Sequence, residues 1–128
     1  MPVDPAVRDL IEAGNFAALA YHRADGTIAN HVMWIDADDD HLLFNTEVHR
    51  PKFKAIEADP RVTITIWDRA NPYHNAEVAG KVVGTDDSEA ARAHIDKLSQ
   101  RYNGTDYANP IQSRRVIVKI DPTRQRVQ

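Results

Sequence analysis

Residues 62–67 carry the most regular alternation in the chain. Val62, Ile64 and Ile66 fall on one side of an extended backbone, and Thr63, Thr65 and Trp67 fall on the other. Side chains two positions apart share a face of a strand, and β-branched and aromatic residues suit a half-buried strand. The stretch therefore predicts a strand with a buried aliphatic face, and the fold of this chain has to be built around a sheet.

Shorter runs predict five further strands. They lie at residues 16–21, 27–36, 41–46, 76–85 and 116–120. Asp25-Gly26 between the first two is typical of a tight hairpin turn. Gly80 and Gly84 indicate a bulge or a close backbone approach within the strand at residues 76–85, and Asp121-Pro122 closes the last strand.

Capping signals predict three helices. The first runs from Asp4-Pro5 to Gly14-Asn15, the second from Pro51 to Asp59-Pro60, and the third over residues 86–103, followed by a loop at residues 105–113. Strands and helices do not alternate regularly along the chain, which argues against a doubly wound sheet. We expect one domain over residues 1–128, mainly β in the α+β class: a six-stranded antiparallel barrel with peripheral helices.

Composition excludes several classes of function. The 16 basic and 19 acidic residues give a net charge of −3, so nucleic-acid binding is not expected. There is no cysteine, and the six histidines show no metal-ligand spacing, so neither a disulfide nor a metal site is expected. No apolar run is long enough for a signal peptide or a membrane span, which favours a cytoplasmic protein. If the protein is an enzyme, a bound cofactor should carry its chemistry.

A phosphate site is one interpretation of residues 45–54, where a strand passes into a short basic helix. Pro51 suits the first helical position, and Arg50, Lys52 and Lys54 place three cations at the helix start. The free N–H groups of a helix start also bind anions. The alternative is an ordinary solvated helix start, because basic residues are common on short surface helices.

Several motifs in order resemble a known family. They are Asn45-Thr46, Arg50-Pro51-Lys52, Ala58-Asp59-Pro60-Arg61-Val62, Asn71-Pro72-Tyr73 and Glu77-Val78-Ala79-Gly80. Together they are similar to the split β-barrel, FMN-binding-like family related to pyridoxamine 5′-phosphate oxidase, over about residues 10 to 121. The Arg-x-Lys form of the phosphate motif resembles the branch that binds the deazaflavin coenzyme F420 in place of FMN. The resemblance implies a homodimer with two cofactor grooves at the subunit interface.

The same resemblance implies a set of cofactor-binding positions. Arg50 and Lys52 fall where the family holds the cofactor phosphate, with Thr46 supplying a hydroxyl. The remaining positions are Asn45 and Pro51 in the same motif, Asn30, His31, Val32 and Met33 on the strand along the ring, Asn75 as a polar ring contact, and Trp67, which with Tyr73 could close the groove from the other subunit.

The implied reaction is hydride transfer from reduced F420 to an activated double bond or a quinone-like small molecule. His31, His49, Tyr73 and His74 are the candidates for protonating the product. No arginine and histidine pair near Arg124 matches the pyridoxal phosphate site of the true oxidases, which argues against pyridoxamine oxidation. Two alternatives stay open: an FMN-dependent oxidoreductase of the same fold, and a carrier that binds F420 or a flavin without turnover.

Overall fold

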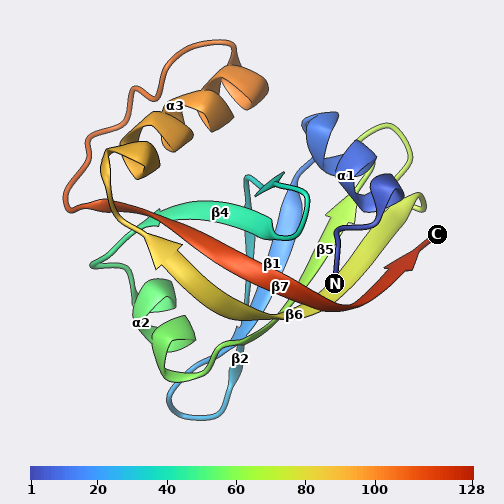
Figure 1. The fold of residues 1–128 in the computed structure, drawn as a ribbon, viewed down its shortest axis with the longest axis horizontal. Helices are drawn as coiled ribbons and strands as arrows, with labels where there is room; N and C mark the ends of the chain where they lie inside the picture. The colour runs from blue at the N-terminus through green and yellow to red at the C-terminus, as the bar shows by residue number, and fades with distance from the viewer.

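The computed structural model describes residues 1–128 as one curled antiparallel sheet with three helices around it (Figure 1). The helices are α1 (Pro5–Glu12), α2 (Pro51–Ala58) and α3 (Glu89–Asn103). The strands are β1 (Ala17–His22), β2 (Ile28–Met33), β3 (Asp36–Ala37), β4 (Leu42–Glu47), β5 (Arg61–Trp67), β6 (Asn75–Asp86) and β7 (Arg115–Val127). Their order across the sheet is β2-β1-β5-β6-β7-β4-β3.

The strand predicted at residues 62–67 is confirmed as β5, near the middle of the sheet. It pairs with β1 on one side and β6 on the other. Val62, Ile64 and Ile66 are buried, while the alternate residues are partly exposed. The buried face joins the main core, which also includes Leu19 and Phe44.

The predicted mainly β, antiparallel fold with peripheral helices is confirmed, but the sheet has seven strands, not six, and does not close into a barrel. The strand predicted at residues 27–36 stops at Met33, and Asp36–Ala37 forms a separate strand that pairs with β4. Between them, the N–H of Ile35 donates to the hydroxyl of Tyr102 on α3 at 3.1 Å. This contact turns the backbone toward α3, so the two halves of the predicted strand become opposite edges of the sheet.

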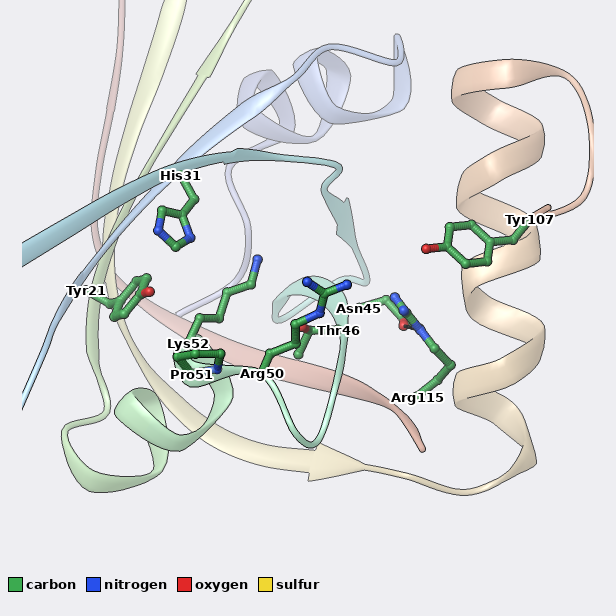
Figure 2. Close-up of a pocket in the computed structure, with 9 residues that line it drawn as sticks. All are labelled: Tyr21, His31, Asn45, Thr46, Arg50, Pro51, Lys52, Tyr107 and Arg115. Atoms are coloured by element: carbon green, nitrogen blue, oxygen red, sulfur yellow. Dashed lines mark hydrogen bonds between the residues drawn. The ribbon is translucent and has the colours of Figure 1, made fainter. Parts of the chain in front are cut away.

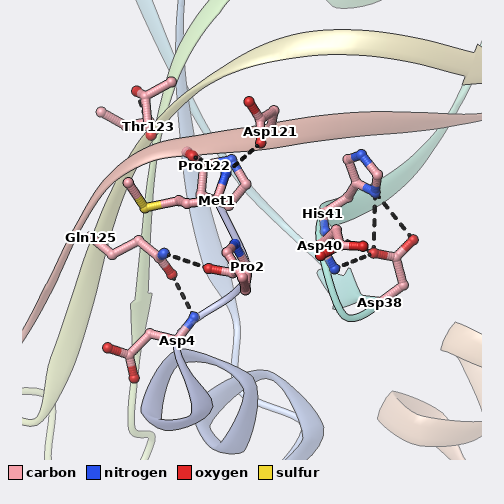
Figure 3. Close-up of polar contacts among 11 residues, drawn as sticks. Met1, Pro2, Asp4, Asp38, Asp40, His41, Asp121, Pro122, Thr123 and Gln125 are labelled. Atoms are coloured by element: carbon pink, nitrogen blue, oxygen red, sulfur yellow. Dashed lines mark hydrogen bonds and ion pairs between the residues drawn. The ribbon is translucent and has the colours of Figure 1, made fainter.

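The end of the last strand was also predicted wrongly, because β7 continues through Pro122 to Val127. Proline has no N–H for a strand partner, but Pro122 lies opposite Gly80, where the register of β6 and β7 shifts. A second shift before Gly84 confirms the predicted irregularity. Figure 3 shows the hydrogen bonds that join this extension of β7 to the N-terminal segment. The side-chain amide of Gln125 donates to the backbone carbonyl of Pro2, and its side-chain oxygen accepts from the N–H of Asp4 at 2.8 Å.

The predicted starts of α1 and α2 and the predicted end of α3 are confirmed, whereas α3, predicted to start at residue 86, starts at Glu89. Asp4 accepts from the N–H of Ala6 at the start of α1, Ser88 caps α3, and Gly104 ends α3 with a φ of 76°. Residues 105–113 form a loop as predicted. In Figure 1, α1 and α3 lie at the top of the view and α2 at the bottom, next to the end of β4. The end of β4 is therefore where sheet, helix and loop meet.

Candidate functional site

A cavity of about 310 Å³ lies where β4 passes into α2 (Figure 2). Six of its nine lining residues belong to the predicted cofactor-binding set: His31, Asn45, Thr46, Arg50, Pro51 and Lys52. The other three are Tyr21 from β1, Tyr107 from the loop after α3, and Arg115 from the start of β7. The fold therefore brings the predicted strand-to-helix motif and the predicted ring-facing strand to one cavity.

The start of α2 lies at the cavity and leaves one backbone donor free for a ligand. Pro51 occupies the first helical position and has no N–H. Arg50 precedes it in an extended conformation and gives no side-chain cap to the helix. The N–H groups of Phe53 and Lys54 donate to the carbonyl of Arg50, so the first turn leaves the N–H of Lys52 without a backbone partner, and the side chains of Arg50 and Lys52 line the same cavity, an arrangement that suits an anion.

Lys52 is a half-buried cation without a carboxylate partner. It forms no salt bridge, and its Nζ lies 5.6 Å from the centroid of the Phe44 ring. Figure 2 shows the amine pointing toward His31. Burial, and then the charges of Arg50 and Arg115, lower the pKa of the Lys52 amine below its ordinary value. A bound anion would reverse the effect of the two neighbouring cations, so the cavity favours an anionic ligand.

One carboxylate, that of Glu47, lies near the cations of the cavity. Glu47 is 1% exposed and ends β4, and its side chain lies 3.8 Å from Nε of Arg50 and 3.9 Å from Nη1 of Arg115. The N–H of Gln112 donates to Oε1 of Glu47 at 2.8 Å. Glu47 therefore forms an ion pair with two of the three cations, Arg50 and Arg115, but a single carboxylate does not neutralise these two and Lys52.

Arg115 is held by a chain of hydrogen bonds that crosses to α3. Its Nε donates to Oδ1 of Asn45 at 2.7 Å, and Nδ2 of Asn45 lies 3.1 Å from Nδ1 of His94. Nε2 of His94 in turn lies 3.0 Å from Oδ2 of Asp36. Because the amide of Asn45 is a donor, Nδ1 of His94 accepts and Nε2 donates, which assigns the neutral tautomer. Arg101 and Lys97 complete the cluster around Asp36 at 3.1 Å each.

Several predicted positions lie outside this cavity. Asn30 and Val32 point to the exposed face of β2, and Met33 lines a neighbouring cavity. β2 is an edge strand, so part of its backbone has no strand partner and stays available for a ligand. Trp67 and Asn75 face each other across β5 and β6, and neither lines the cavity in this chain.

Among the predicted proton donors, the cavity includes His31 and none of the other three. Burial, and then the charge of Lys52, lower the pKa of His31. His49 lies outside the cavity, with Nδ1 2.5 Å from Oγ of Ser113. Tyr73 is 81% exposed, and His74 next to it contacts the carbonyl of Gln128 at 2.7 Å.

Sequence reasoning missed Tyr21, Tyr107 and Arg115. Tyr21 had a usable signal, because it shares the inward face of a predicted strand with Ala17 and Leu19. Arg115 had none, since it comes to the cavity through the pairing of β7 with β4, which sets it opposite Glu47. Tyr107 lies in a loop whose position depends on α3.

The sequence profile of the pyridoxamine 5′-phosphate oxidase family matches residues 3–128, so this chain belongs to that family. A solved structure named F420 reductase is 30% identical, with a TM-score of 0.84, over 98% of this chain and 100% of that one. A conserved protein of Mycobacterium tuberculosis is 22% identical, with a TM-score of 0.72, over 96% of this chain and 82% of its own. General Stress Protein 26 from Bacillus anthracis is 18% identical, with a TM-score of 0.71, over 94% of this chain and 88% of its own. A comparison with curated proteins found no match.

No helix is long and apolar enough to cross a membrane. No group of three or more histidine and acidic side chains is arranged to hold a metal ion.

Proposed function

We propose that this chain is an F420-dependent oxidoreductase that acts as a homodimer and reduces an activated double bond or a quinone-like small molecule. The observation that carries the proposal is the convergence of Thr46, Arg50 and Lys52 on one cavity beside the edge strand β2. Membership of the pyridoxamine 5′-phosphate oxidase family supports a flavin-type cofactor. The similarity to a protein named F420 reductase supports F420 over FMN.

The chemistry of the donor set fits an anionic, phosphate-bearing cofactor. In this proposal Arg50 and Lys52 hold the phosphate, and the largely buried hydroxyl of Thr46 contributes a neutral donor. The flat part of the cofactor lies along β2, where unpaired backbone groups of the edge strand meet its polar rim. When bound, reduced F420 supplies a hydride, and the acceptor also takes up a proton.

His31 is the residue that we assign to the proton. It lines the cavity next to Tyr21, whose ring centroid is 5.3 Å away in an edge-on arrangement. Its pKa is lowered by burial and by Lys52, so the free site favours neutral imidazole. A bound anion offsets the charge of Lys52 and favours protonation of His31, which couples cofactor binding to proton uptake.

A second copy of the chain would complete the groove. Ile28 and Val32 lie on the outer face of β2 and are 65% and 67% exposed, beside the strand proposed to contact the cofactor. Exposed aliphatic side chains on an edge strand suit contact with another subunit. The partner's copies of Trp67 and Tyr73 would then reach the groove that they do not reach within one chain.

Binding and turnover together test the proposal. F420 and FMN are titrated separately into the protein while tryptophan fluorescence is measured, and reduced F420 is then mixed with a panel of quinones and enones. Tighter binding of F420 than of FMN, with oxidation of reduced F420 that depends on the acceptor, supports the proposal. Preference for FMN would instead support an FMN enzyme, and tight F420 binding without turnover over the whole panel would support a carrier.

A further inference from the structure

A second cavity, of about 270 Å³, opens beside the first. Its walls are mostly apolar, formed by Met33, Trp34, Ile95, Leu98 and Tyr107, and its polar residues are Asn45, Asn109 and Arg115. Asn45, Tyr107 and Arg115 line both cavities. A molecule in the second cavity therefore lies next to whatever occupies the first. The proposed cofactor phosphate accounts for Arg50 and Lys52 but leaves the second cavity without an occupant.

Trp34 forms a fixed flat wall of this cavity. Its ring stacks on Tyr102 with centroids 5.1 Å apart and planes 4° from parallel, and Tyr102 stacks on Phe16 at 5.5 Å. The hydroxyl of Tyr102 donates to the carbonyl of Asn15 at 2.6 Å, and the guanidinium of Arg69 lies 4.2 Å from the centroid of Phe16. This column holds Trp34 in place from behind. A flat conjugated molecule could stack beside such a wall with favourable geometry.

Arg115 supplies the one cation of the second cavity. It is 8% exposed, and its guanidinium lies 5.2 Å from the centroid of Tyr107. Its Nε is occupied by Asn45 at 2.7 Å, whereas Glu47 lies 3.9 Å from Nη1, beyond hydrogen-bond distance. A guanidinium has five N–H donors in a planar fork, so Arg115, oriented through Nε and lying beside Tyr107 and Glu47, has further N–H donors for a ligand. The geometry that a carboxylate requires is thus built before the ligand arrives.

We infer that the second cavity binds the hydride acceptor, and that this acceptor is a small planar conjugated carboxylate whose acid group pairs with Arg115 while its unsaturated part stacks beside Trp34. The inference rests on the proposed function, because it places the acceptor next to a cofactor in the first cavity. The inference narrows the proposed substrates from any molecule with an activated double bond to conjugated molecules that also carry a carboxylate. Asn45 is then a positioning residue, which holds Arg115 for both cavities.

The experiment compares two probes that differ in charge and hardly in shape, trans-cinnamate and cinnamamide. Calorimetry on the wild-type chain, without and with saturating F420, should show binding of cinnamate at least about tenfold tighter in both cases. In nitrogen-15 spectra cinnamate should shift the indole N–H of Trp34, identified through the Trp67→Phe variant. Equal affinity for the two probes, or a shift confined to Trp67, would overturn the inference.

Three variants test whether Arg115 is the residue that binds the carboxylate of cinnamate. Arg115→Met should bring the ratio of the two affinities to about one, whereas Arg114→Met, at an exposed neighbour paired with Asp87, should leave it unchanged. Lys52→Met should also leave the ratio unchanged; if it alone abolished the preference, cinnamate would be in the first cavity and the inference would be wrong. If Arg115→Met does not fold, the ratio of the two affinities in the wild-type chain still decides.

The proposed function and this inference can fail separately. If F420 does not bind, the proposed function is wrong, but the ratio of the affinities for cinnamate and cinnamamide is not affected. If F420 binds and that ratio is one, only the inference is wrong.

Discussion

Nε2 of His94 donates to Oδ2 of Asp36 at 3.0 Å, in the buried cluster that connects α3 to Asn45 and the cavity. Asp36 is 2% exposed, and three basic groups surround its carboxylate. Burial alone raises the pKa of Asp36, but hydrogen bonds from His94, Ala37 and Lys97 and the charge of Arg101 outweigh it and hold that pKa well below its usual range. This cluster therefore supports both the fold and the orientation of Arg115.

Asp36→Asn should destabilise the protein by about 3 kcal/mol at neutral pH, because it removes the anion from a buried charge cluster. The folded pKa of Asp36 lies below the unfolded value of about 3.9, so its stabilisation is complete above that value and is lost as pH falls through the folded pKa. Urea unfolding from pH 7 to pH 3 should thus show a constant difference from wild type that shrinks below about pH 4. Asp40→Asn, on an exposed turn, is the control. A difference that grows at low pH would contradict this account.

Lys52→Ala should weaken F420 binding by about 1.5 to 3 kcal/mol, or roughly ten- to 150-fold, because it removes a charge-assisted bond to the phosphate. Fluorescence titration measures the effect. Lys54→Ala, two residues along α2 and exposed, should change the dissociation constant little. An equal loss in both variants would show a general charge effect, and no loss in Lys52→Ala would remove Lys52 from the site.

Gly80→Ala should lower the free energy of unfolding by about 1 to 3 kcal/mol. A Cβ at Gly80 would lie 2.6 Å from the carbonyl oxygen of Asp121 and 2.8 Å from Cγ2 of Ile120, so the bulge between β6 and β7 would have to open. A Cβ at Gly84 meets nothing within 4 Å, and Gly84→Ala should change stability by less than about 1 kcal/mol. Chemical denaturation of the pair checks the prediction, which fails if the two variants are equally stable.

Val32→Glu should convert a dimer to a monomer, because it places a charge on the aliphatic outer face of β2 proposed for the subunit contact. Sedimentation velocity of wild type and variant measures the change. Val83→Glu, at a 56% exposed position on β6, is the matched control and should remain dimeric. A wild-type chain that sediments as a monomer would exclude the dimer, and a Val32→Glu variant that stays dimeric would place the contact elsewhere.

Local patterns in the sequence were sufficient for most of the elements. The alternation at residues 62–67 predicted β5, and the cap at Asp4 predicted the start of α1, because each depends on neighbouring residues only. The strand-to-helix motif likewise predicted that Arg50, Lys52 and Lys54 would face a common point. Arg50 and Lys52 line one cavity, whereas Lys54 is exposed and lies outside it. Periodicity failed at residues 27–36, where a hydrogen bond from Ile35 to Tyr102, distant in sequence, outweighs the local preference for a continuous strand.

The amino-acid sequence by itself determined the sheet, the helix at Pro51 and the cations beside it, since these follow from side-chain spacing and backbone preferences. Tertiary structure alone decided that Arg115 and Tyr107 join those cations, that Trp34 becomes a wall of a second cavity, and that Asp36 lies buried among three basic groups. Each of these depends on contacts between residues far apart in the chain, where the register of β4 against β7 and the packing of α3 set the positions. No local pattern encodes such a register.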